Sequence, residues 1–261
     1  MQDIITRIEA LRKPGRKFLT NDYAGLARAG NFADAVFSES SAVLTYEDHG
    51  VFRAVYYSSD MEDLGGVLSG IPHRGVMLDF ITRDREEHKS LLEAAGFEVF
   101  AVMLRFANPD CRDVFDEGHV LHEFAGVNAG RMAEVHEAEE INAEMHRIFD
   151  TRVSHLLTDE EFAEAIKRRE ISIYRNPDTG KLEAVLHVFI QPQKFYISHV
   201  YNSAHKSIVH SLMHERLKEY WDSGGIYMYC WINEKNAPSI RFHQKYGMQH
   251  DGMYNLVYVQ R

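Results

Sequence analysis

Side chains that can move protons lie in the last third of the chain. His199 and Tyr201 alternate along the apolar run 194–201, so they share one face of an expected strand. Imidazole gains and loses a proton near neutral pH, which makes His199 a candidate general base or a group that orients one. The alternative is a buried histidine hydrogen-bonded to the backbone, because buried polar groups are normally paired.

Metal chemistry is not indicated. The 15 histidines are scattered, and neither a His-Glu-x-x-His run nor paired Cys/His spacing occurs. The segment 134–146 is rich in glutamate and histidine, but it lacks a repeated Glu-x-x-His pair and its members spread around a helix. We interpret it as a solvated face, from which Glu139 or Glu140 could meet a cationic amine.

Hydrophobic periodicity predicts the elements that must position these side chains. Apolar positions recur at helical spacing over 131–149, and a turn at 176–180 joins two strand-like runs. The expected order is a strand (119–125), two helices (131–149 and 159–169), a hairpin (171–191), a strand (194–201), a helix (207–221), and then strand, helix and strand between 225 and 260.

An internal repeat organises the whole chain. Residues 75–108 and 225–260 share one order: an apolar strand, a helix that closes on Gly plus an apolar residue, and a second strand. This repetition suggests a tandem duplication. In the first copy, a hairpin over 41–60 and a short helix over 61–71 precede the repeated part. We therefore expect a first domain at 1–108, a polar linker at 109–118 and a second domain at 119–261.

Composition limits the classes of function. The 261 residues are 45% hydrophobic with a formal net charge of −10, a balance that argues against nucleic acid as a main partner. No apolar stretch is long enough to span a membrane, and the N-terminus lacks the pattern of a secretory signal. The two cysteines do not suggest a disulfide framework, so a cytoplasmic protein is expected.

The run from Asn236 to Met248 (NAPSIRFHQKYGM) carries a family likeness. It resembles the closing motif of the GNAT superfamily of acyl-CoA-dependent N-acyltransferases, and the element order of residues 119–261 looks like the GNAT fold. The resemblance implies two α/β (α+β) domains, each a mixed, mostly antiparallel sheet flanked by helices. The first copy resembles only the back half of the fold, so it is expected to be a reduced GNAT-like domain.

The likeness also implies where the cofactor binds. In the family, a glycine-containing loop before the long helix cradles the CoA pyrophosphate with backbone N–H groups. The matching positions here are 204–209, with Ser207 and Val209 in place of the glycines. The helix N-terminus remains, and His205 and Lys206 could add positive charge. The expected cofactor-binding residues are Val200, His205, Lys206, Ser207, Ile208, Val209, Asn236 and Ser239. Asn236 also reads as the cap of the following helix.

The catalytic expectations follow from the same resemblance. The position of the family's tyrosine, which protonates the leaving thiolate, is taken by His243. With an ordinary pKa, His243 would act as the acid and would lose its proton around neutrality. His199 or a carboxylate would be the base, Tyr201 a further catalytic candidate, and a backbone N–H near these two would stabilise an oxyanion. The first copy has Leu92 at the matching position and acidic residues at 60–63, so it is expected not to be catalytic.

Together these features predict an enzyme that moves an acetyl or other acyl group from acetyl-CoA or another acyl-CoA to a primary amine of a small molecule or peptide. No metal, nucleic acid or membrane is expected to take part, and a homodimer is compatible with the sequence. Two alternatives stay open. One is a non-catalytic tandem GNAT-like binding or regulatory protein, and the other is a GNAT-fold transferase with an acyl donor other than CoA.

Overall fold

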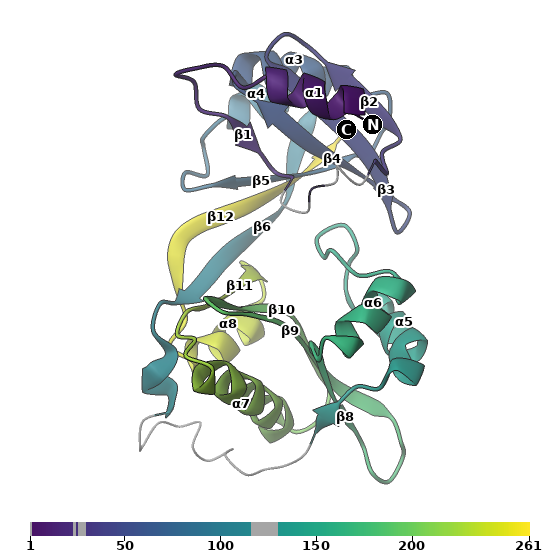
Figure 1. Cartoon of the computed structure of the whole chain (residues 1–261), viewed down its shortest axis with the longest axis vertical. Helices are drawn as coiled ribbons and strands as arrows, with labels where there is room; N and C mark the ends of the chain where they lie inside the picture. Colours follow the sequence, from purple (N-terminus) through teal and green to yellow (C-terminus); the bar gives the residue numbers. More distant parts are fainter. Residues whose placement is uncertain (1, 23–24, 26–29, 116–129) are drawn as a thin grey trace. The chain divides into compact units, whose positions relative to one another are not determined.

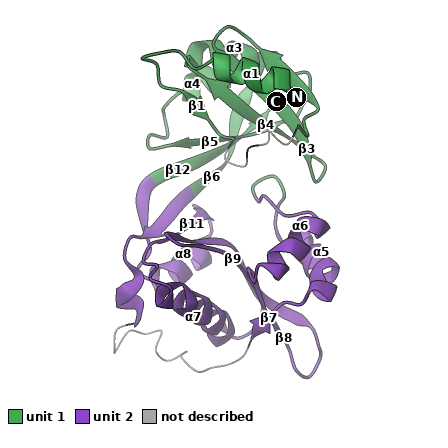
Figure 2. Ribbon diagram, viewed as in Figure 1, with its two compact units in different colours: residues 1–103, 151–153, 253–261 green, residues 104–150, 154–252 purple. Residues whose placement is uncertain are grey.

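The computed structural model describes residues 2–22, 25, 30–115 and 130–261, which fall into two compact units. Unit 1 comprises residues 1–103, 151–153 and 253–261, and unit 2 comprises residues 104–150 and 154–252 (Figure 2). The last nine residues thus belong to the unit built from the first part of the chain, whereas the sequence pattern assigns them to the second domain. The domain limits 1–108, 109–118 and 119–261 stay a prediction.

Unit 1 begins with a short helix, and two small strands that the sequence pattern did not indicate come after it (Figure 1). The expected hairpin, helices and repeated strands follow them. Asp60 caps the first of the helices after the hairpin by accepting hydrogen bonds from the backbone N–H groups of Glu62 and Asp63. The elements are α1 (Gln2–Ala10), β1 (Leu19–Thr20), β2 (Asp34–Phe37), β3 (Ser41–Asp48), β4 (Val51–Ser58), α3 (Met61–Ser69), β5 (Met77–Thr82), α4 (Lys89–Ala94) and β6 (Phe97–Asn108).

Unit 2 contains the remaining elements, except that most of the last strand belongs to unit 1 (Figure 2). None of its described helices, nor those of unit 1, is long and apolar enough to cross a membrane. The elements are η1 (Cys111–Phe115), β7 (Arg131–Met132), η3 (Val135–Glu137), α5 (Ala138–Ile148), α6 (Asp159–Lys167), β8 (Ile171–Arg175), β9 (Leu182–Gln191), β10 (Lys194–Asn202), α7 (Lys206–Asp222), β11 (Met228–Asn233), α8 (Ala237–Gln244) and β12 (Gln249–Gln260).

The strands follow the order β2-β3-β4-β5-β12-β6-β11-β10-β9-β8-β7, with β1 added beside β4. Two pairs, β4–β5 and β10–β11, are parallel, and the other pairs of described register are antiparallel. The predicted fold class, a mixed and mostly antiparallel sheet flanked by helices, is confirmed. In each copy the parallel pair joins the two strands on either side of a helix, which is α3 in unit 1 and α7 in unit 2.

The sheet of unit 2 is covered on both faces. Leu186 of β9 packs in one core with Leu212 and Leu217 of α7, whereas its neighbour Val185 packs in another with Phe162 of α6. Successive side chains of a strand point to opposite faces, so α7 and α6 lie on opposite sides of the sheet. Burial on both faces explains why β9 reads as a continuous apolar run rather than an alternating one.

One sequence-based helix boundary was wrong. The helix predicted from residue 131 begins at Ala138, because Arg131 and Met132 pair with β8 and a 3₁₀ turn follows them. The predicted polar linker contains η1, whose Cys111 is fully buried in a core of unit 2. The strand expected at 119–125 lies outside the described residues.

Candidate functional site

The parallel strands of unit 2 are joined over a short ladder only. Residues 195–197 of β10 pair with residues 228–230 of β11, whereas β10 itself continues to Asn202. The pairing of β10 with β9 shifts register by one residue between Ile197 and His199. Such a bulge bends the strand and increases its twist, so β10 diverges from β11 beyond Ile197. Backbone groups that would otherwise complete the ladder are thereby available to a ligand.

The long helix α7 begins just after this divergence. His205 is its N-cap, and the His205 Nδ1 atom accepts a hydrogen bond from the backbone N–H of Ser207 at 3.3 Å. Nδ1 also lies 2.8 Å from the Ser207 hydroxyl. Lys206 is exposed at the first position of the helix. The positive end of the helix and the Lys206 ammonium therefore favour an anion at this point, although one N–H already has a partner within the chain.

The side chains of three predicted cofactor-binding residues belong to the core. Val209 is 4% exposed, and Val200 and Ile208 pack against the core cluster beneath α7. Val209 has only its backbone groups to offer a ligand, whereas Val200 and Ile208 are partly exposed. The structure thus brings His205, Lys206 and Ser207 together at the helix start.

Helix α8 follows β11 and carries the closing motif. The Asn236 side chain accepts a hydrogen bond from the Ser239 N–H at 3.1 Å, which confirms it as the helix cap. One turn later, His243 Nδ1 lies 2.8 Å from the Ser239 carbonyl oxygen. A carbonyl oxygen only accepts, so Nδ1 carries the proton of the ring. The unprotonated Nε2 is buried and has no hydrogen-bond partner in the described part of the chain.

Burial sets the charge of His243. The side chain is 3% exposed. Desolvation lowers its pKa from 6.5 to about 4, against the opposing effect of the hydrogen bond to Ser239. The expectation that His243 has an ordinary pKa near neutrality is therefore wrong, because the apolar surroundings disfavour the imidazolium. At neutral pH the ring is neutral, and its free Nε2 lone pair is an acceptor rather than a donor.

His199 is also buried and neutral. Desolvation lowers its pKa to about 4, and His155 acts in the same direction. Its Nδ1 lies 3.0 Å from the Ser198 hydroxyl, and its ring lies edge-on to Phe149 at 4.9 Å. A neutral imidazole can accept a proton, so the arrangement is compatible with a base.

A second histidine, which the sequence pattern did not single out, stacks on His199. His187 of β9 is its cross-strand neighbour, with ring centroids 5.8 Å apart and planes 16° from parallel. Burial lowers the pKa of His187 to about 3, and its Nε2 has no partner in the described residues. Because side chains alternate between the two faces of a strand, the sequence could have assigned His187 to one face of the sheet. Its position opposite His199, however, depends on the bulge.

Tyr201 lies two residues further along β10. Its hydroxyl donates a hydrogen bond to the Ser203 hydroxyl at 3.0 Å, and its ring packs against the core beneath α5 and α6. Another pair that the sequence did not reveal is His210 and Tyr246, whose Nδ1 and hydroxyl lie 3.0 Å apart in the buried contact between α7 and the end of α8. That pair links the two helices and holds α8 in place.

The acidic segment before and within α5 is largely neutralised. Hydrogen bonds from Arg131, at 2.7 Å, lower the pKa of Glu137 to about 2. Glu140 forms an ion pair with Arg175 at 2.7 Å. Glu139 is exposed and is the better placed of the two residues proposed to meet an amine.

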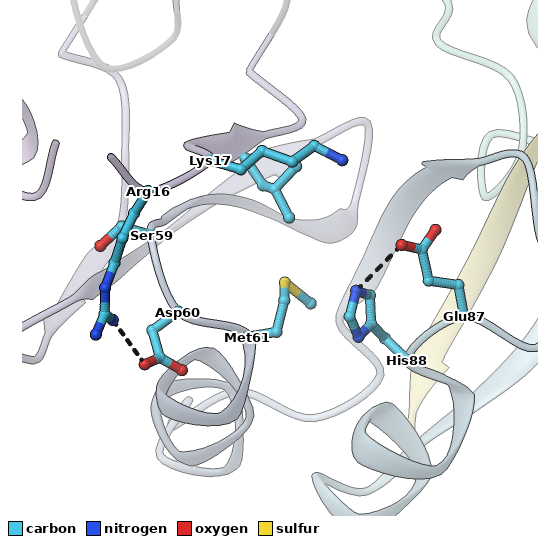
Figure 3. Close-up of a pocket in the computed structure, with 8 residues that line it drawn as sticks. Arg16, Lys17, Ser59, Asp60, Met61, Glu87 and His88 are labelled. Carbon is cyan, nitrogen blue, oxygen red and sulfur yellow. Dashed lines mark hydrogen bonds and ion pairs between the residues drawn. The ribbon is translucent and has the colours of Figure 1, made fainter. Parts of the chain in front are cut away.

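Unit 1 has a counterpart of the strand divergence, but with different surroundings. Its ladder joins Arg53 and Ala54 of β4 to Met77 and Leu78 of β5. A pocket of about 460 Å³ lies by the start of α3 (Figure 3). In it Arg16 forms an ion pair with Asp60 at 3.0 Å. The lining residues are Arg16, Lys17, Leu19, Ser59, Asp60, Met61, Glu87 and His88.

Several solved structures have a similar fold. A GCN5-related N-acetyltransferase from Sphaerobacter thermophilus superposes with a TM-score of 0.60 at 14% identity, over 98% of this chain and 91% of its own. An acetyltransferase of the GNAT family from Novosphingobium aromaticivorans gives 0.54 at 12%, over 90% and 93%. A tandem GNAT protein from the clavulanic acid biosynthesis pathway gives 0.52 at 10%, over 94% and 98%.

No protein-family model matches the sequence, and neither does any curated protein. The structural likeness nevertheless extends over nearly the whole chain. The chain therefore has the fold of the GNAT superfamily of acetyltransferases.

Proposed function

We propose that the protein transfers an acetyl or other acyl group from an acyl-CoA to a primary amine, and that unit 2 performs the reaction. The observation that carries the proposal is the divergence of β10 from β11 directly before the start of α7. The names of the structural relatives, which are acetyltransferases, support the same reaction class.

The residues present fit such a carrier. Lys206 and the first N–H groups of α7 would hold the phosphates, with His205 and the Ser207 hydroxyl beside them. Asn236 and Ser239, at the start of α8, would contact the part of the carrier nearer the thioester. The carrier supplies the activated acyl carbon, and the protein binds, orients and moves protons.

The two buried histidines suggest how the proton travels. The amine nitrogen forms a bond to the acyl carbon, the carbon–sulfur bond breaks, and the proton lost by nitrogen ends on sulfur. We assign that transfer to His243, whose unprotonated Nε2 can receive the proton and then release it, so that the ring is neutral before and after. His199, also neutral, would orient the amine or act as a second acceptor, with Tyr201 beside it. The freed N–H groups of β10 would stabilise the oxyanion.

A binding protein without turnover is the rival function. One observation favours it: the imidazole of His205 already accepts from the Ser207 N–H that a phosphate would use. A ligand would have to displace that cap or bind through the remaining N–H groups.

Calorimetry with acetyl-CoA tests the proposal. Wild-type protein should bind it, and Lys206→Glu should weaken binding by roughly tenfold or more, because a carboxylate at a helix N-terminus repels phosphate. The matched control is Glu62→Lys, at the corresponding helix start of unit 1, which should leave the affinity unchanged.

Binding followed by amide formation with any amine in a screen of polyamines, amino acids and peptide N-termini would establish transfer. Binding without product across the screen would favour the rival. If Lys206→Glu and Glu62→Lys both left the affinity unchanged, the carrier would not lie at α7.

A further inference from the structure

The diverging strands of unit 1 are bridged by a side chain from the chain's own N-terminal segment. The Asn21 amide nitrogen donates to the backbone oxygen of Ala54 on β4 at 3.1 Å and to that of Asp79 on β5 at 3.0 Å. The Asn21 amide oxygen accepts from the backbone N–H of Tyr56 at 2.7 Å. One side chain thus forms hydrogen bonds with three backbone groups at the end of the β4–β5 ladder.

The residues on either side of Asn21 also bind to β4. Leu19 and Thr20, as β1, pair with Ser58 and Tyr57 of β4. β5 pairs with β4 only as far as Ala54. Beyond that residue, Leu19 and Thr20 pair with the same edge of β4. Asp22 follows and accepts a hydrogen bond from the Tyr57 hydroxyl.

The start of the next helix, where an anion could bind, is also occupied by a side chain of the protein itself. At the start of α3, the Asp60 carboxylate accepts from the N–H groups of Glu62 and Asp63, and Arg16 pairs with it. Those N–H groups are the counterparts of the ones at the start of α7. A negative charge of the protein itself lies where unit 2 would place a phosphate.

The corresponding place in unit 2 is different. Counting from the end of each parallel ladder, the counterparts of Ala54, Tyr56 and Asp79 are Ile197, His199 and Trp231. Among the described residues, no side chain joins the backbone of these three.

We infer that Leu19–Asp22 is a built-in plug, which fills the ligand cleft of unit 1 and restricts carrier binding to unit 2. The restriction of carrier binding to unit 2 rests on the proposed function. The plug itself does not. The plug explains why the protein has two diverging strand pairs but only the pair of unit 2 is available to a ligand.

Amide hydrogen exchange tests the plug without any ligand. In Asn21→Ala, exchange at Tyr56 N–H should rise roughly five- to tenfold, because its acceptor is removed, while exchange at His199 N–H should not change. The matched control is Asn176→Ala, which removes a side chain bonded to the N–H of Asp178 in a turn of unit 2. It should raise exchange at Asp178 and leave Tyr56 unchanged. Unchanged protection of Tyr56 in folded Asn21→Ala would overturn the inference.

Should Asn21→Ala fail to fold, Asn21→Asp keeps the size and the acceptor but removes both N–H donors. It should lower the melting temperature more than Asn176→Asp does, and an equal or smaller effect would contradict the plug.

Calorimetry then tests the restriction to unit 2. Wild type should bind one acetyl-CoA per chain, and Lys206→Glu, with Asn21 intact, should bind it roughly tenfold or more weakly and show no second site. A second site in wild type, or a site retained in Lys206→Glu and lost in Asp60→Arg, would overturn the restriction. If wild type binds no acetyl-CoA at all, the proposed function fails, and the exchange experiment still decides whether the plug exists.

Discussion

His243 shows how burial changes the chemistry that a residue type suggests. Its Nδ1–H donates to the Ser239 carbonyl, and its unprotonated Nε2 is buried without a hydrogen-bond partner among the described residues. With a pKa lowered to about 4, the ring is already neutral at pH 6 and stays so at higher pH. The sequence-based expectation of an acid that loses its proton around neutrality is wrong, and the proposed shuttle begins from the neutral ring.

The first prediction concerns that shuttle. His243→Phe keeps an aromatic ring of similar size but removes the nitrogen that receives the proton. The kcat for a competent amine should fall by roughly 10- to 1000-fold with little change in carrier affinity. His243→Tyr should retain much of the activity, because a hydroxyl can also receive and release a proton.

The pH profile provides the second readout. Between pH 6 and 9, the wild-type rate should follow ionisation of the amine substrate, with no step from His243. A wild-type kcat that loses activity with an apparent pKa near 7, and a His243→Tyr variant that does not, would restore the acid role and exclude the shuttle.

At the scale of elements, the connection between α7 and β11 fixes the positions of the candidate site. Gly225 lies between them, packed so closely that an added Cβ would lie 2.1 Å from the ring of Tyr220. Tyr220 is fully buried, and its hydroxyl donates to the Tyr227 carbonyl at 2.9 Å. The close packing of Gly225 against the Tyr220 ring thus fixes the path of the chain from α7 to β11.

Gly225→Ala should therefore destabilise the protein by about 1–3 kcal/mol, as overpacking of a core does. The matched control is Gly66→Ala, inside α3, where an added Cβ meets nothing within 4 Å. That change should stabilise by roughly 0.5–1 kcal/mol, because alanine is the better helix residue. Urea denaturation measures both, and a neutral Gly225→Ala would mean that Tyr220 moves aside freely.

For the whole molecule, buried histidines concentrate in unit 2. His187, His199, His210 and His243 are each less than a tenth exposed, and burial lowers the pKa of each. A group with a depressed folded-state pKa contributes stability above its unfolded pKa and loses that contribution as pH falls toward the folded value. Unit 2 should therefore lose stability progressively from about pH 7 downward.

His187→Phe tests this sensitivity to acid. The folded-state pKa of His187 is about 3, so at pH 5 the unfolded state alone binds the proton. Wild type should lose about 2 kcal/mol through this residue between pH 7 and 5. The variant keeps a ring beside Phe162 and Phe189 and should lose correspondingly less. If the free energy of unfolding depended on pH equally in wild type and in His187→Phe, His187 would titrate alike in the folded and unfolded states.

Sequence by itself determined what depends on neighbours a few residues away. The periodicity of 207–221 predicted α7, found at Lys206–Asp222, and Asn236 with Pro238 predicted the start of α8. Two strand-like runs and the turn residues between them predicted the hairpin of β8 and β9. Caps, turns and amphipathic spacing act within one or two turns of chain, so they can be read locally.

The tertiary structure decided whatever depends on residues far apart in the chain. Asn21 bridges Ala54 and Asp79, 33 and 58 residues away, and no local pattern marks it. The stacking of His187 on His199 required a bulge in a neighbouring strand. The charge of His243 depends on how completely other elements exclude water from it, because desolvation is a property of the packed surroundings and not of residue type.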